Sequence, residues 1–265
     1  MVIVRPILRP DATGNMKINL SFTPSELRRM DQAGSRVVVI DVLRACSTMI
    51  YALSQGCKGI HPCDTVSKAK DLFRQKVKSL GKGRVLLGGE RGGVRVGGFH
   101  LGNSPEEYSS DAVRGRTVIF TTTNCTRNLT AVRSPKEVII CSFVNLHTVV
   151  EYLSREDADI LLALSGTDGQ MSLEDAVCGG MLINMLSERR EVVLSDSART
   201  AHVLYLHYRR NIRQALLDSS HGKRLLELGF KDDIDFCAGV GKYEIIPRHV
   251  RGRVVCRVSK HSFLV

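Results

Sequence analysis

Short apolar runs alternate with longer helical segments along most of the chain, which is the pattern of an α/β domain. Residues 37–40, Val-Val-Val-Ile, are apolar without alternation, as expected of a strand that is covered on both faces. Strands are predicted at residues 36–41, 58–62, 84–88, 116–121, 137–141 and 159–164. Two further short strands are expected near residues 243–246 and 253–258.

Helices are predicted between these strands, near residues 46–55, 65–78, 104–110, 125–132 and 145–155. A longer helix should begin at Ser172, a good N-cap with Asp175 at the third helical position, and run toward Arg189. From about residue 195 the pattern is mostly helical, through residue 213 and again over residues 220–228. Because no linker, repeat or clear boundary interrupts the chain, we expect a single domain over residues 1–265.

Composition narrows the class of protein. The chain has 265 residues, of which 43% are hydrophobic, so it can bury a substantial core, and the sequence has no apolar run long enough to span a membrane. None of the eight cysteines forms a C-x-x-C pair, so we expect free thiols and a cytoplasmic location. A homodimer is possible.

The net charge of +11 suggests an anionic partner, either a nucleic acid or a small polyanionic substrate. Only 5% of the residues are aromatic and there is no Trp, which argues against a surface that stacks nucleic-acid bases. A nucleic-acid partner is therefore the less favoured alternative.

Polar side chains gather just after the predicted strands, where the loops of an α/β sheet form ligand sites. The residues in question are Asp41 and Arg44 after the first strand, Glu90, Arg91, Asn103 and Ser104 after the third, Thr122, Thr123, Asn124, Thr126 and Arg127 after the fourth, and Glu174 and Asp175 after the sixth. Glycines and arginines suit an anion, and carboxylates suit Mg²⁺. Together these loops predict a site for a metal-bound oxyanion.

Several of these residues also have a purely structural interpretation. Asp41 and Arg44 could form an ion pair, Asn124 and Ser104 could each cap the helix that follows, and Asp175 could belong to a capping box. Glu90 is different, because a carboxylate between two glycine pairs has no obvious structural need. It is the strongest candidate for a functional role.

The loops together resemble the 2-phosphosulfolactate phosphatase family, the ComB-like proteins. The matching stretches are residues 41–45, 89–93, 101–105, 122–127 and 172–176, followed by 228–230 and Asp233. The resemblance implies a three-layer α/β/α fold with a mixed, largely parallel sheet. It also implies Mg²⁺-dependent hydrolysis of (R)-2-phospho-3-sulfolactate to 3-sulfolactate and phosphate, a reaction on a route toward coenzyme M. Cys46, Cys125 and His100 depart from the family pattern. The Cys125 side chain would narrow the phosphate loop, the stretch over residues 122–127 that is expected to bind the phosphate.

Other phosphatase designs do not fit the sequence. No cysteine has an arginine six positions later, no Asp-x-Asp follows an apolar strand, and there is no Walker P-loop. A Mg²⁺ site with attack by water remains, and a covalent intermediate on Asp41 stays open. Hydrolysis of another small phosphate ester, or a basic non-catalytic protein that binds anions or nucleic acid, are the alternative functions.

Site roles follow from this hypothesis. The catalytic set is Asp41, Glu90, Arg44 and Arg91, and the metal ligands are drawn from Asp41, Glu90, Glu174 and Asp175. Substrate is expected to contact Asn103, Ser104, Thr122, Thr123, Asn124, Thr126 and Arg127.

Overall fold

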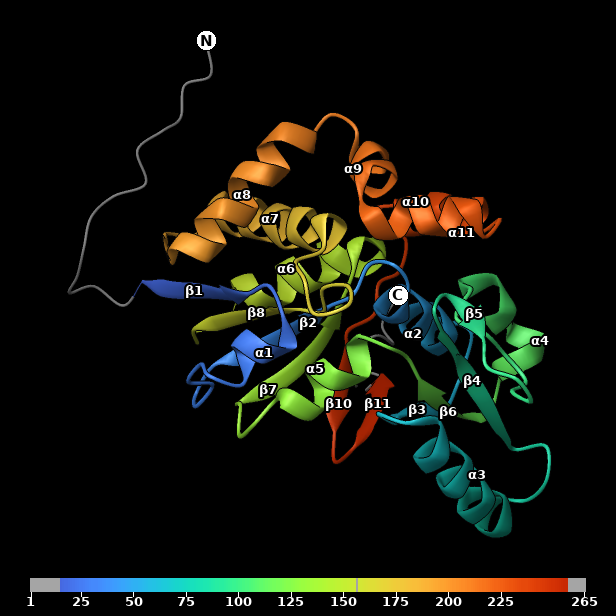
Figure 1. Cartoon of the computed structure of the whole chain (residues 1–265). Coiled ribbons are helices and arrows are strands. Elements are labelled where there is room, and N and C mark those ends of the chain that lie inside the picture. The colour runs from blue at the N-terminus through green and yellow to red at the C-terminus, as the bar shows by residue number, and fades with distance from the viewer. Residues whose placement is uncertain (1–14, 156, 257–265) are drawn as a thin grey trace, which may run out of the picture.

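The computed structural model describes residues 15–155 and 157–256. Within these residues one eleven-stranded sheet has the order β5-β4-β6-β3-β11-β10-β7-β2-β8-β1-β9 (Figure 1). Its strands are β1 (Met16–Ser21), β2 (Arg36–Ile40), β3 (Gly59–Pro62), β4 (Val85–Arg91), β5 (Val94–Arg95), β6 (Thr117–Thr121), β7 (Glu137–Cys141), β8 (Ile160–Leu164), β9 (Val192–Leu194), β10 (Pro247–Val250) and β11 (Arg253–Cys256).

The sheet is mixed and largely parallel. Strands β9, β1, β8, β2 and β7 pair in parallel, as do β3, β6 and β4. The antiparallel β10–β11 hairpin from the end of the chain joins these two parallel groups, because β10 pairs with β7 and β11 pairs with β3. The antiparallel β4–β5 hairpin forms one edge of the sheet.

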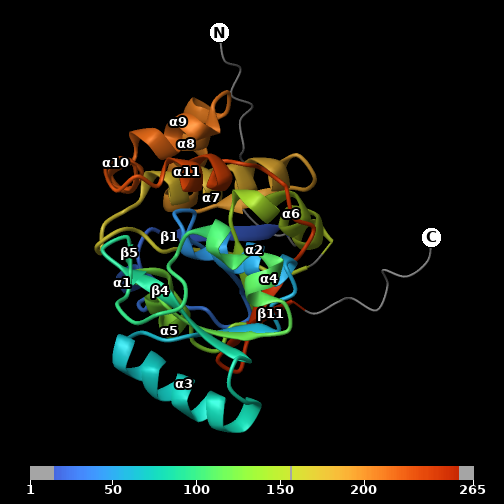
Figure 2. The ribbon, with the colours of Figure 1, turned by 90° about the vertical axis from the view of Figure 1, so that its right-hand side faces the viewer.

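Helices cover both faces of this sheet. They are α1 (Pro24–Leu27), α2 (Ala45–Ser54), α3 (Val66–Leu80), α4 (Ser110–Val113), α5 (Cys125–Ala131), α6 (Leu146–Ser154), α7 (Leu173–Ser187), α8 (Asp196–Tyr208), α9 (Ile212–Asp218), α10 (Ser220–Glu227) and α11 (Lys231–Cys237), with 3₁₀ turns η1 (Pro105–Tyr108) and η2 (Phe143–Asn145). Helices α6 to α11 lie together on one side, and α3 lies at the opposite end of the molecule (Figures 1 and 2). No helix in the described part of the chain is both long and apolar enough to cross a bilayer.

The interior strand β2 shows why three layers form. Val38 and Ile40 pack into a core with residues of α6, α7 and α8, whereas Val37 and Val39 pack into a second core with residues of α1, α2 and α5. Both faces of the strand are therefore covered, as its unbroken apolar sequence indicates. The predicted α/β architecture, with its mixed and largely parallel sheet, is confirmed.

The six strands predicted before residue 165 are present as β2, β3, β4, β6, β7 and β8. Strands β1, β5 and β9 were not predicted. The strand expected at residues 243–246 is wrong, since the chain there follows η2: the Tyr243 amide donates to Val144 O, and Asn145 donates to Ile245 O. Strand β10 begins only at Pro247, and the end of the strand expected at 253–258 lies outside the described residues.

The predicted helices are present, with one change. Residues 104–110 form the 3₁₀ turn η1 followed by the start of α4, not one α-helix. Ser172 caps α7 as predicted, because its hydroxyl accepts from the Asp175 amide.

Candidate active site

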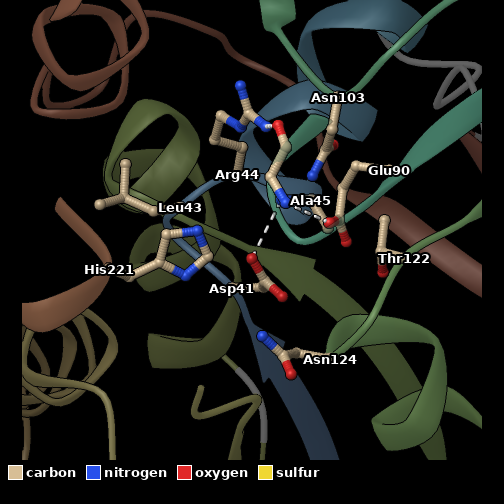
Figure 3. A pocket seen from close by; sticks show the side chains of 10 residues that line it. Asp41, Leu43, Arg44, Ala45, Glu90, Asn103, Thr122, Asn124 and His221 are labelled. Atoms are coloured by element: carbon tan, nitrogen blue, oxygen red, sulfur yellow. Dashed lines mark hydrogen bonds between the residues drawn. The ribbon is translucent and has the colours of Figure 1, made fainter. Parts of the chain in front are cut away.

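Loops that follow three strands of the sheet meet at one small cavity. It lies beyond the carboxyl ends of β2, β4 and β6, and the first turn of α10 closes one side (Figure 3). The lining residues are Asp41, Leu43, Arg44, Ala45, Glu90, Gly93, Asn103, Thr122, Asn124 and His221. Its volume of about 10 Å³ is close to the space that one water molecule needs. Three of the four loops that the sequence predicted to converge line this cavity, and the loop after β8 does not contribute to the lining.

Asp41 is the buried carboxylate at the end of β2. One of its oxygens accepts from the Ala45 amide at 3.0 Å, at the first residue of α2. Burial, together with the negative charges of Glu174 and Glu90, raises the pKa of Asp41 to about 7. A carboxylate whose ionised form is disfavoured by neighbouring carboxylates is a natural position for a cation.

Glu90 joins the loop after β4 to the loop after β6. Its Oε2 accepts from the Gly93 amide at 2.8 Å, and its Oε1 accepts from the Thr123 amide at 2.8 Å and the Thr123 hydroxyl at 3.1 Å. Gly89 allows the two strands to approach, since a Cβ there would lie 2.0 Å from Thr121 O. Glu90 is thus a structural bridge as well as a lining carboxylate.

The first turn of α7 supplies two more buried carboxylates. Asp175 accepts from the Val42 amide at 2.8 Å and the Gly166 amide at 3.2 Å, so it ties three segments together and does not close a capping box. Burial raises the pKa of Asp175 well above its usual value, as do the charges of Asp41 and Glu174. The Oε2 atom of Glu174 is buried and has no hydrogen-bond partner among the described residues.

Arg44 is buried and lines the cavity with Asp41 and Glu90, but its ion-pair partner is Asp233. One terminal nitrogen donates to Asp233 at 2.6 Å, the other donates to Gly93 O at 2.6 Å, and the guanidinium carbon lies 4.4 Å from the centre of the Phe230 ring. The ion pair between Asp41 and Arg44 that the sequence allowed is therefore wrong. Instead, Arg44 fixes α11 and the loop after β4 against the cavity.

Three polar side chains line the cavity without an evident structural role. Asn103 Oδ1 and Thr122 Oγ1 are buried, and neither finds a hydrogen-bond partner within residues 15–155 and 157–256. Asn124 occupies the N-cap position of α5, but its side chain makes no capping hydrogen bond, so the capping interpretation is wrong. Buried polar atoms in folded proteins normally have a partner, so these groups point to a bound ligand.

The remaining predicted site residues lie outside the cavity lining. The Arg91 guanidinium donates to Glu90 O at 2.6 Å and to the Thr121 hydroxyl at 2.8 Å. The Thr126 hydroxyl donates to Thr122 O at 2.9 Å, and Arg127 is exposed on α5. Their contact with substrate stays a prediction.

Ser104 and Thr123 act through the residues that line the cavity. The Ser104 hydroxyl donates to Asp233 at 2.5 Å and makes no capping bond to η1, so the interpretation of Ser104 as a helix cap is wrong. Asp233 therefore accepts from both Ser104 and Arg44. Thr123 holds Glu90.

The departures from the family pattern do not obstruct the cavity. The Cys125 thiol is buried 3.8 Å from the Cys46 thiol and does not contribute to the lining, so the expected narrowing of the phosphate loop is wrong. His100 accepts from the Leu87 amide through Nδ1 at 3.0 Å, which is a structural contact. Among the polar side chains that line the cavity, His221 was not predicted, because it lies more than 90 residues beyond the last predicted loop residue of the lining, Asn124, and no local sequence motif marks it.

The oxygen atoms around Asp41 suit a Mg²⁺ ion that takes only part of its ligands from the protein. They are less suited to a metal ion whose ligands all come from protein side chains. Within the described residues, no three His, Cys, Asp or Glu side chains are arranged to hold a metal ion by themselves. Mg²⁺ commonly uses one or two carboxylates and completes its shell with water and phosphate oxygens. The unpartnered Glu174 oxygen and the raised pKa of Asp41 fit such a partial site.

Comparison with known proteins agrees with this geometry. A family model described as 2-phosphosulpholactate phosphatase matches residues 21–252. A probable 2-phosphosulfolactate phosphatase of Carboxydothermus hydrogenoformans is 40% identical over 248 residues, covering 92% of this chain and 99% of that protein. Proteins with the same name from Clostridium acetobutylicum (35% identical, 91% of this chain and 100% of that protein) and Thermotoga maritima (40% identical, 81% of this chain and 89% of that protein) are also similar.

Proposed function

The chain belongs to the 2-phosphosulpholactate phosphatase family and is a phosphatase, a phosphoric monoester hydrolase. From this premise we propose that it requires Mg²⁺ and hydrolyses (R)-2-phospho-3-sulfolactate, or a related phosphorylated 2-hydroxy acid, to 3-sulfolactate and phosphate. The observation that carries the proposal is the cavity in which Asp41 meets the unpartnered oxygens of Asn103 and Thr122.

Two carboxylates are suited to hold the metal. Asp41 lines the cavity, and Glu174 has a buried oxygen with no partner among the described residues. Bound Mg²⁺ would offset the negative charge of the phosphoryl group as it is transferred to water. Glu90 and Asp175 accept from backbone amides through both oxygens, so their part is to fix the loops that carry the site.

The polar lining supplies the contacts for the phosphorylated acid. Asn103, Thr122 and Asn124 offer amide and hydroxyl groups at the positions where loops after β4 and β6 face Asp41 (Figure 3). Because Glu90 fixes the loops after β4 and β6 through the Gly93 and Thr123 amides, these groups need little reorganisation to stabilise charge on phosphate. The net charge of +11 favours a substrate that carries phosphate, sulfonate and carboxylate together.

Phosphate release from a panel of esters tests the substrate. The panel contains 2-phospho-3-sulfolactate, 2-phospholactate (which lacks the sulfonate), 3-phosphoglycerate and p-nitrophenyl phosphate. We expect the highest kcat/KM for 2-phospho-3-sulfolactate. A preference for 2-phospholactate would identify the substrate as a related 2-hydroxy acid without the sulfonate. A preference for 3-phosphoglycerate, which carries its phosphate on the 3-hydroxyl, or for p-nitrophenyl phosphate would contradict the proposed substrate class.

Metal removal and one matched pair of variants test the role of Mg²⁺. We expect EDTA to abolish turnover, excess Mg²⁺ to restore it, and Asp41→Asn to lose most of the Mg²⁺-dependent rate. Asp71→Asn is the control, since Asp71 is an exposed residue of α3 whose partner is Arg74. Full activity in EDTA, or an Asp41→Asn enzyme as active as Asp71→Asn, would contradict the proposal.

A further inference from the structure

His221 is a cavity-lining residue from a segment far from the strand-end loops. It lies in the first turn of α10, and its ring stands beside Asp41 and Leu43 (Figure 3). Its Nδ1 atom lies 3.3 Å from the Thr167 hydroxyl, in the loop that follows β8. Thr167 is the only hydrogen-bonding side chain that the described residues provide to this ring.

Both sides of this contact are held in place. Thr167 exchanges two backbone hydrogen bonds of 2.9 Å with Gln170, which closes a tight turn. On the other side, the Ser219 hydroxyl caps α10 by accepting from the Gly222 amide at 2.9 Å. The His221 ring is therefore positioned before any ligand arrives.

The contact with Thr167 determines which ring nitrogen can serve the cavity. A neutral imidazole has one N–H donor and one acceptor nitrogen. When the Thr167 hydroxyl donates to Nδ1, the proton of the ring is on Nε2, at the opposite edge. Burial lowers the pKa of His221, and the Arg44 charge acts in the same direction. The negative charges of Glu174, Glu90 and Asp168 oppose this shift, and the net change is a lowered pKa.

We propose that His221 binds the phosphorylated acid by donating a hydrogen bond from Nε2 to one of its anionic oxygens, and that Thr167 is the positioning residue that fixes this tautomer. The inference deepens the proposed function and rests on it. It adds a donor on the α10 side of the cavity, opposite the loops that carry Asn103 and Thr122. An Nε2–H donor directed at an anion resembles the donors of other preorganised oxyanion sites.

The tautomer of the His221 ring can be determined by NMR without measuring catalysis. In ¹⁵N-labelled, ligand-free protein, two-bond ¹H–¹⁵N correlations should show His221 with an unprotonated Nδ1 and a protonated Nε2, with His221→Gln used for assignment. Thr167→Val should lose this preference, and Thr167→Ser should keep it because the hydroxyl remains. A wild-type ring protonated on Nδ1 would overturn the proposal.

Binding of inorganic phosphate in the presence of Mg²⁺, measured by calorimetry, tests the contact itself. A hydrogen bond to a charged acceptor implies that His221→Leu weakens phosphate binding by about tenfold to a hundredfold. His221→Gln should retain most of the affinity, because its amide N–H lies near the Nε2 position. His221→Asn should behave like His221→Leu, since its amide reaches only the Nδ1 position.

The outcomes separate this proposal from the proposed substrate. Phosphate is a product of every phosphate-ester hydrolysis, so a different preferred ester would contradict the proposed substrate and leave this test intact. If His221→Leu folds, as judged by its urea transition, and binds phosphate as tightly as the wild type, the inference is wrong. Equal losses in His221→Gln and His221→Leu would also overturn it.

Discussion

Glu90→Gln is the substitution whose effect can be worked out most directly from the structure. The carboxylate accepts a backbone N–H at each oxygen, from Gly93 on one side and from Thr123 on the other. A glutamine side chain has one oxygen and one NH₂ group. Whichever way the amide is turned, its NH₂ group faces a backbone N–H, so one buried donor loses its acceptor.

The size of the effect follows from opposing contributions. Leaving a buried N–H without an acceptor costs about 1–3 kcal/mol, and the hydrogen bonds that remain weaken because their acceptor is no longer charged. Removing the Glu90 charge also relieves its repulsion of Asp41, which acts in the opposite direction. We expect a net loss of about 2 kcal/mol in the free energy of unfolding, together with a loss of most turnover.

Urea unfolding of the metal-free protein measures this loss. Glu107→Gln is the matched control, because Glu107 accepts from one backbone amide, that of Gly102 at 2.8 Å, and its side chain is 32% exposed. A glutamine oxygen can keep that single bond, so the control should change stability by less than about 0.5 kcal/mol. Equal stability of Glu90→Gln and the wild type would refute the bridging role of Glu90.

Three other predictions concern the residues beside Glu90. Thr122→Val removes a buried hydroxyl that has no partner among the described residues. The variant should therefore unfold at the same urea concentration as the wild type or a higher one, and its kcat/KM should be lower. A clear loss of stability would contradict this prediction. Because the pKa of Asp41 is raised to about 7 from 3.8, the folded protein keeps a proton that the unfolded chain releases. The stability of the metal-free protein should therefore fall as pH rises from about 4 to 7, on the order of 4 kcal/mol. Asp41→Asn should reduce this dependence, and the part that remains should come from Asp175, whose pKa is also raised. A pH profile unchanged by Asp41→Asn would contradict the raised pKa of Asp41. Lysine has no planar guanidinium, so Arg44→Lys cannot contact Asp233 and Gly93 O with two separate nitrogens. We expect urea unfolding to show a loss of about 2–4 kcal/mol in the free energy of unfolding. A loss below about 0.5 kcal/mol would contradict this prediction.

Much of the fold follows from local sequence, and the errors have physical causes. The unbroken apolar run of β2 identified a strand covered on both faces. Strand β9 has only three residues and β5 only two, so neither carries enough pattern to be recognised. The apolar alternation at residues 243–246 resembled a strand, but Tyr243 and Ile245 pack on the core beside α2 and the chain follows η2.

The site was predicted where the position of the backbone alone decides the outcome. The end of a parallel strand fixes the place of Asp41 and Thr122, and both reach the cavity. The direction of a long side chain depends on neighbours that the sequence does not reveal, which is why Arg91 turns back to Thr121 and Arg127 faces solvent. His221 reaches the cavity only through the packing of α10, a tertiary event.

The position of the β10–β11 hairpin has a consequence for synthesis of the protein. Residues 247–256 fill the gap between β7 and β3, so the two parallel groups have no strand-to-strand link until the last part of the chain is available. While the ribosome still holds that segment, β3 and β7 present open edges, and open edges attract other strands. A premature stop codon shortly before codon 247 would leave those edges permanently exposed and yield an aggregation-prone product, although every residue of the cavity had been made.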